Sequence, residues 1–258
     1  MKPNRVKQLL REGKAACGTW VSLCSPIAAE AVGLCGFDWL LVDMEHGAGD
    51  YSTLIGQLQA IGCAGESEPI VRVQWNDPVV VKRVLDAGAR GVMIPGIKTV
   101  EEAKRAIAST KYPPQGFRGI ASVRAGKFGL DANYLKEAND QILVYLQVET
   151  KEAVKDIDAI LDLPGIDVCF IGPNDLAADL GHIGELTHPD TVAAIERVEK
   201  AAKARKIPLG TVSRGWDAAK VLYDKGYLAV SVQSDVNFLI NAARQAMDSF
   251  RAHPAGKR

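Results

Sequence analysis

Short apolar runs alternate with helix-like segments along this chain, and the alternation occurs eight times in 258 residues. The runs are apolar at nearly every position, which indicates strands buried on both faces, as in a parallel sheet covered by helices. Eight strand–helix units in a chain of this length are typical of a (β/α)8 TIM barrel. The strands are predicted at 16–23, 37–43, 69–73, 91–95, 142–148, 167–172, 208–212 and 228–232.

No linker rich in Gly, Ser or Pro divides the chain, so we predict a single α/β domain over residues 1–258. Helix starts follow the strands: Asp50 is a typical N-cap, and Thr99 with Glu102 forms a capping box. A last helix is predicted over 235–250, and a Pro/Gly-rich loop at 112–129 interrupts the alternation. An open doubly wound sheet is the alternative, but it usually carries a glycine-rich phosphate turn that SLCSPIA lacks.

Composition argues against several functional classes. Basic and acidic residues balance at 31 each, so no basic surface for nucleic acid or an anionic membrane is expected. The N-terminal segment lacks the apolar core of a signal peptide, and no apolar run reaches the ~20 residues of a membrane span. We therefore predict a cytoplasmic protein that acts on a small molecule. The five cysteines have no C-x-x-C spacing and lie mostly in apolar runs, which predicts buried, reduced thiols.

Polar side chains stand at the carboxyl ends of four predicted strands, the ends that form the active-site face of a barrel. Each alone fits a structural role, such as a helix cap, a loop histidine or an ion pair. Together they indicate a site, because every buried unpaired polar group costs ~1–3 kcal/mol. The set is Asp43, Glu45 and His46 after the second strand, Arg72 in the third, Gln147 and Glu149 in the fifth, and Asp175 after the sixth.

Two carboxylates, Glu149 and Asp175, end successive strand units, and a buried ionised acid requires compensation by a cation or donor. Without cysteine ligands and with few histidines, a hard divalent cation, Mg²⁺ or Mn²⁺, fits better than zinc. The turn from Gly172 through Asn174 opens a helix whose first N–H groups can bind a carboxylate. A 2-oxo acid fits both features, and Arg72 would add positive charge where an enolate oxygen develops.

Five motifs occur in one order: GFDWLLVDMEH, VRVQWNDP, YPPQGFRG, LVYLQVET and FIGPNDLAADLG. From about residue 18 to residue 230 they resemble the HpcH/HpaI aldolases, the metal-dependent class II pyruvate aldolases. The resemblance implies a TIM barrel of the phosphoenolpyruvate/pyruvate type, with the last helix exchanged between subunits in a hexamer built as a trimer of dimers. The segments GTVSRG and VSVQSD, at strands seven and eight, depart from the family pattern and concern the choice of aldehyde.

The resemblance also implies a role for each site residue. Glu149 and Asp175 would bind the divalent cation, with Co²⁺ a candidate besides Mg²⁺ and Mn²⁺. Arg72 would bind the keto or enolate oxygen, His46 would be the acid and base for the aldol hydroxyl, and Asp43 would orient either one. Gln147 would contact the substrate or support a metal ligand. The helix start at Gly172, Asn174 and Asp175 would hold the substrate carboxylate. Asp86 would reach the histidine of an adjacent subunit.

These features predict a carbon–carbon lyase that reversibly cleaves a 4-hydroxy-2-oxo acid to pyruvate and an aldehyde through a metal-stabilised pyruvate enolate. A Schiff-base lysine is the rival route to that enolate, but only Lys98 follows a strand end. Two other functions stay open. One is a CoA-thioester lyase similar to the citrate-lyase β relatives, and the other is a catalytically silent barrel that binds a 2-oxo acid.

Overall fold

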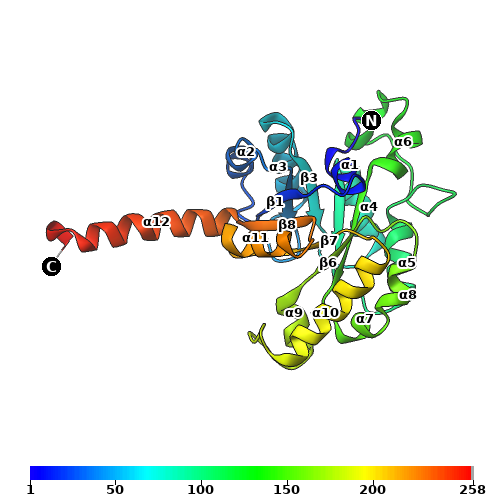
Figure 1. Ribbon diagram of the computed structural model, residues 1–258. Helices are drawn as coiled ribbons and strands as arrows, with labels where there is room; N and C mark the ends of the chain where they lie inside the picture. The colour runs from blue at the N-terminus through cyan, green and yellow to red at the C-terminus, as the bar shows by residue number, and fades with distance from the viewer. Residues whose placement is uncertain (257–258) are drawn as a thin grey trace.

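Eight parallel strands close into a barrel in the computed structural model, which describes residues 1–256 (Figure 1). Each strand pairs with the next one in the sequence, and β8 pairs with β1. The predicted (β/α)8 fold is therefore confirmed. The single domain was predicted over residues 1–258, and residues 257–258 lie outside the described residues. The strands are β1 (Ala16–Val21), β2 (Trp39–Asp43), β3 (Glu68–Arg72), β4 (Gly91–Ile94), β5 (Leu143–Val148), β6 (Val168–Ile171), β7 (Leu209–Val212) and β8 (Ala229–Ser234).

The helices begin at the predicted caps. Asp50 and Thr53 bond reciprocally as a capping box, and so do Thr99 and Glu102. The helices are α1 (Arg5–Arg11), α2 (Pro26–Gly33), α3 (Tyr51–Ala64), α4 (Pro78–Asp86), α5 (Val100–Ser109), α6 (Tyr134–Gln141), α7 (Lys151–Lys155), α8 (Ile157–Leu161), α9 (Pro173–Asp179), α10 (Pro189–Ala204), α11 (Trp216–Asp224) and α12 (Asp235–Ala252), with 3-10 turns η1 (Arg124–Gly129) and η2 (Pro254–Gly256).

The core has two layers, because successive residues of a strand point alternately into the barrel and toward the helices. Trp39, Tyr145 and Phe170 fill the interior, and a larger aliphatic layer lies between the strands and the helices. A glycine makes room for the largest interior side chain: a Cβ on Gly18 would lie 2.0 Å from the indole of Trp39. The filled interior leaves the carboxyl ends of the strands as the place for a site.

Helix α1 was not expected from the sequence. Val6 and Leu10 pack into the interior cluster, and the Lys7 ammonium donates to the Ile142 carbonyl at 2.8 Å and pairs with Asp167 at 2.9 Å. These contacts lie at the amino ends of β5 and β6, so α1 closes that end of the barrel. The predicted loop 112–129 contains η1 and leads into α6, which was not predicted either.

Helix α12 extends away from the barrel (Figure 1). Asp235 is its one buried residue. Its exposed side chains include large apolar ones, namely Phe238, Leu239, Ile240, Met247 and Phe250. Exposed apolar area of this kind is typical of an interaction surface. The predicted exchange of this helix between subunits stays a prediction.

All five cysteines are free, as predicted, but their predicted burial is wrong for four of them. Cys169 is buried, Cys17 and Cys24 are partly exposed, and Cys35 and Cys63 are exposed. The apolar runs that suggested burial are in part helix ends, where the side chain faces solvent. Among residues 1–256, no helix is both long and apolar enough to cross a membrane.

Candidate active site

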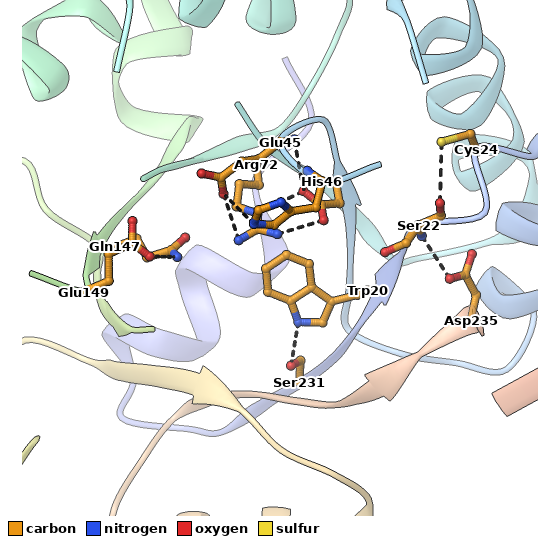
Figure 2. Close-up of polar contacts among 11 residues, drawn as sticks. Trp20, Ser22, Cys24, Glu45, His46, Arg72, Gln147, Glu149, Ser231 and Asp235 are labelled. Atoms are coloured by element: carbon orange, nitrogen blue, oxygen red, sulfur yellow. Dashed lines mark hydrogen bonds and ion pairs between the residues drawn. The ribbon is translucent and has the colours of Figure 1, made fainter. Parts of the chain in front are cut away.

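Arg72 is the most constrained charged residue at the mouth of the barrel. Its Nε and Nη2 groups donate to the two carboxylate oxygens of Asp43 at 2.9 and 2.7 Å, and Nη1 lies 2.9 Å from Glu45. The guanidinium also lies 4.4 Å above the Trp20 ring. Figure 2 shows Arg72 between Glu45, His46 and Trp20. Bidentate pairing and stacking fix the orientation of the planar guanidinium, which a single lysine charge does not achieve.

Asp43 holds Arg72 and also orders the loop after β2. Its Oδ1 atom accepts from the backbone N–H groups of Glu45 and His46, at 3.1 and 3.3 Å. The His46 side chain is 68% exposed, and its Nε2 atom lies 4.0 Å from a Glu45 oxygen. Burial raises the pKa of Glu45, while the charges of Arg72 and His46 lower it. The His46 backbone is therefore fixed at the mouth, and its imidazole is largely exposed there.

Glu149 follows β5 and is almost fully buried. One carboxylate oxygen accepts from the Gly96 N–H at 2.7 Å, and the other contacts the Gln147 amide nitrogen. Burial raises the pKa of Glu149 to about 6; the Gly96 hydrogen bond opposes this shift, and the charges of Asp175 and Glu45 add to it. These donors do not compensate the carboxylate fully, so a cation would stabilise its ionised form.

The loop after β6 lies against Glu149. A Cβ on Gly172 would lie 2.8 Å from a Glu149 oxygen and 3.1 Å from the Gln147 amide nitrogen, so the close approach requires glycine here. Helix α9 starts at Pro173 and carries Asn174 and Asp175 in its first turn, both exposed. The fold thus brings the two predicted ligand acids to adjacent strand ends.

A cavity of about 450 Å³ opens at this mouth and is large enough for a small metabolite. Of the predicted residues, His46, Arg72, Gln147, Gly172, Asn174 and Asp175 line it. Asp43 and Glu149 are buried beside them. The segments 210–215 and 230–235, which were expected to concern the choice of aldehyde, contribute Arg214, Ser231 and Gln233 to the wall, although no single residue was named there. Trp20 of β1 and Asn237 of α12 were not predicted.

The donor set suits a hard divalent cation. Glu149 and Asp175 offer carboxylate oxygens, and the buried Oε1 atom of Gln147 has no hydrogen-bond partner in the described part of the chain. Oxygen ligands of this kind are those that Mg²⁺ and Mn²⁺ prefer.

A different cluster, His182, His188 and Asp190, also brings three metal-ligand types together. It lies between α9 and α10, and none of its residues lines the cavity at the mouth. Its imidazoles stack with their centroids 3.4 Å apart and their planes 16° apart. Nearly parallel rings direct their lone pairs in parallel rather than at one ion, and His188 Nδ1 already accepts from the Asp190 N–H at 3.2 Å. In this arrangement the cluster caps α10.

Asp86 lies far from this mouth within the protomer. Helix α4 runs from the carboxyl end of β3 to the amino end of β4, and Asp86 is its last residue. There it accepts from the buried Arg118 side chain at 2.7 Å. A contact between Asp86 and His46 therefore requires a second subunit, and that part of the expectation stays a prediction.

A closed barrel with polar side chains at the carboxyl ends of its strands is the arrangement typical of TIM-barrel enzymes. The family model for HpcH/HpaI aldolase/citrate lyase matches residues 16–242. The 5-keto-4-deoxy-D-glucarate aldolase of Shigella boydii is 41% identical over 96% of this chain and 97% of its own length, and an Escherichia coli protein of the same name matches to the same extent. This chain belongs to the HpcH/HpaI aldolase/citrate lyase family.

Solved structures agree. The crystal structure of a HpcH/HpaI aldolase/citrate lyase family protein from Burkholderia cenocepacia has a TM-score of 0.94 and 42% identity, and covers 96% of this chain and 100% of that one. The HpcH/HpaI aldolase from Desulfitobacterium hafniense has a TM-score of 0.87 and 30% identity, with 98% of each chain covered. The predicted family, the barrel and the aldolase type of carbon–carbon lyase are therefore confirmed.

Proposed function

We propose that this enzyme reversibly cleaves a 4-hydroxy-2-oxo acid to pyruvate and an aldehyde. The observation that carries the proposal is the fixed Arg72 guanidinium in the same cavity as Gln147 and Asp175, with buried Glu149 beside them. A positive group and an acidic oxygen-ligand site together match the keto oxygen and carboxylate of a 2-oxo acid. The names of the Shigella and Escherichia relatives support a substrate of this class.

A divalent cation is the proposed cofactor, with Mg²⁺ or Mn²⁺ favoured and Co²⁺ a further candidate. Glu149 and Asp175 would hold it, and the Gly96 N–H would keep the Glu149 carboxylate in place. When bound, the cation would supply Lewis-acid polarisation of the keto group. Gln147 would orient Glu149, and the backbone N–H groups near Asn174 and Asp175 would hold the substrate carboxylate.

The residues of this chain would divide the remaining work. Asp43 fixes Arg72, so that the guanidinium donates to the substrate oxygen on which negative charge develops. His46 takes the proton of the C4 hydroxyl as the C3–C4 bond breaks, and it returns a proton to the aldehyde oxygen in the reverse direction. The direct test is pyruvate release from a 4-hydroxy-2-oxo acid, followed through reduction of pyruvate by lactate dehydrogenase; the absence of release with Mg²⁺ and with Mn²⁺ would reject the proposal.

His46→Ala is expected to lower aldol cleavage by ~10²-fold or more, the size of effect usual for a positioned acid or base. Proton exchange at C3 of pyruvate should fall much less, because it involves no C4 hydroxyl. Cleavage is measured by pyruvate release and exchange by NMR in deuterated water. His253→Ala, an exposed histidine after α12, is the matched control and should leave both rates unchanged. Equal losses in cleavage and exchange would remove His46 from this role.

We also propose an oligomer, a hexamer built as a trimer of dimers, in which α12 packs on a neighbouring subunit. The exposed apolar residues of α12 support this assembly, since such a surface is stabilised by burial against a partner. In the same assembly Asp86 of one subunit would hydrogen-bond to His46 of the next and fix its tautomer. Each site would then contain residues from two chains.

Hybrid oligomers test this shared site. His46→Ala and Asp86→Asn chains, each weakly active alone, are mixed, dissociated and reassembled, and the hybrids are confirmed by native mass. Some sites then combine an intact His46 with an intact Asp86, so activity should rise above that of either parent. The thermal midpoint of Asp86→Asn is measured beside this, because the substitution also weakens the contact with Arg118. Confirmed hybrids without any recovery would rule the shared site out.

A further inference from the structure

The strands β7 and β8 direct alternate side chains into the barrel. Along β7, a Cβ on Gly210 would meet interior Phe170, Val212 packs with the interior cluster, and Arg214 follows two residues later at the mouth. Along β8, interior Ala229 is followed by Ser231 and Gln233, which line the cavity. Strand β7 ends at Val212, and Arg214 lines the cavity from the bend that follows it.

The backbone on both sides of Arg214 is fixed to β8. The Ser213 N–H donates to the Ser231 carbonyl at 2.9 Å, and its hydroxyl donates to the same carbonyl at 2.8 Å. The Gly215 N–H donates to the Val232 carbonyl at 2.7 Å. Gly215 has φ 121°, a conformation that favours glycine and directs the chain into α11. Arg214 therefore projects from a fixed backbone at the rim of the cavity.

The two arginines of the cavity differ in their partners. Arg72 is held by Asp43 and Glu45, whereas no acidic side chain within residues 1–256 lies at ion-pair distance from Arg214. Its neighbours in the cavity wall are neutral hydrogen-bonding groups, among them Ser213, Gln233 and Asn237. The Arg214 guanidinium thus keeps its donors for a ligand, and a guanidinium binds a carboxylate in a bidentate way.

The balance of charge at the mouth of the barrel favours a separate cation for an anionic aldehyde. Asp43, Glu45, Glu149 and Asp175 together carry more negative charge than Arg72 and one divalent ion compensate. The pyruvate carboxylate adds a further negative charge. A second carboxylate on the substrate would be repelled from this mouth unless a separate positive group received it. Arg214 is the cavity residue that can do so.

We propose that Arg214 determines which aldehyde the enzyme accepts, by binding a carboxylate carried on the aldehyde half of the substrate. This inference rests on the proposed aldol cleavage. In that reaction the C3–C4 bond of a dicarboxylic 4-hydroxy-2-oxo acid breaks, the C4 hydroxyl loses its proton to the base, C3 gains a proton, and the products are pyruvate and a semialdehyde anion. Ser213, Gln233 and Asn237 provide hydrogen bonds for hydroxyl groups of the same fragment.

Matched aldehydes measure this selectivity in the direction of aldol addition to pyruvate. Succinic semialdehyde is compared with butanal, and glyoxylate with acetaldehyde, so that each anion has a neutral partner of equal chain length. The wild-type enzyme should prefer at least one anion by ~10-fold or more in kcat/KM, the range expected for a charge-assisted pair. Arg214→Gln should lower kcat/KM for that anion by a similar factor and change the neutral partner by less than ~2-fold.

Arg214→Lys should retain part of the preference, because it keeps the charge and loses the fork. Arg105→Gln, at an exposed arginine on α5, is the control and should change nothing. Pyruvate C3 proton exchange should be normal in every variant. Two results would overturn this inference alone. One is a wild-type enzyme that catalyses exchange and cleavage but shows no preference for anionic aldehydes. The other is an equal loss of kcat/KM for the anionic and the neutral aldehyde in Arg214→Gln. A wild-type enzyme without exchange or cleavage would overturn the proposed function and this inference with it.

Discussion

Thorough chelation with EDTA is expected to abolish aldol cleavage, and Mg²⁺ or Mn²⁺ is expected to restore it. The physical reason lies at Glu149, a buried carboxylate with a pKa raised to about 6 and with the charges of Asp175 and Glu45 nearby. Without a cation these acids repel one another and the keto group is not polarised. Cleavage is measured after gel filtration into metal-free buffer and again after titration with each ion.

Two controls separate loss of the cation from loss of the fold. Far-UV circular dichroism of the chelated protein should be unchanged, because the barrel core does not depend on the site. Glu149→Gln should be inactive even with added ion, since a neutral amide is a weaker ligand than a carboxylate. Full activity in the thoroughly chelated enzyme would exclude the metal-dependent mechanism.

Arg72→Lys is expected to lower kcat by at least ~10²-fold, the loss typical of a missing donor to a developing oxyanion. Lysine keeps the positive charge. It cannot bind both oxygens of Asp43, contact Glu45 and stack on Trp20 as the planar guanidinium does, so the charge leaves its position beside the substrate oxygen. Steady-state kinetics with saturating Mg²⁺ measure the change.

Arg90→Lys is the matched control for Arg72→Lys. Arg90 is also an ion-paired arginine, with its Nε atom 3.0 Å from Glu68, but it is only partly buried and stands at the amino end of β4. Arg90→Lys should lower the thermal midpoint of unfolding by about as much as Arg72→Lys does. It should leave kcat within ~2-fold of the wild-type value. Near-wild-type turnover in Arg72→Lys would show that Arg72 is a structural ion pair and no more.

The barrel was predictable because its strands are apolar on both faces, a pattern that few other folds require. Helix α1 was missed because it is short and buries only Val6, Lys7 and Leu10. Its apolar stripe is therefore too narrow to stand out among charges. The burial of cysteines was overestimated for a related reason. Apolar neighbours of Cys35 and Cys63 in the sequence do not reveal which side of a helix end faces solvent.

The charged half of the site was also predictable, since acids and an arginine at the ends of apolar strands are costly unless they are paired. The family resemblance implied that Asp43 would orient Arg72 or His46, and the side chain that it pairs with is Arg72. The additional contact of Arg72 with Glu45 was not predicted. Ser231 and Gln233 carry no such cost signal. Their segment, 230–235, was expected to concern the aldehyde, but the alternation along β8 is what shows which of its side chains line the cavity. The proposed contact of Asp86 with His46 involves a second chain, which no pattern within one chain encodes.

Deuterium exchange at the methyl group of pyruvate tests the central claim most directly, because it reports removal of a C3 proton from pyruvate without any aldehyde. Pyruvate is incubated with the enzyme and Mg²⁺ or Mn²⁺ in deuterated water, and the methyl signal is followed by proton NMR. The account predicts loss of the signal with either ion, and no loss with EDTA or with Glu149→Gln. A methyl signal that persists with the wild-type enzyme and both ions would contradict it.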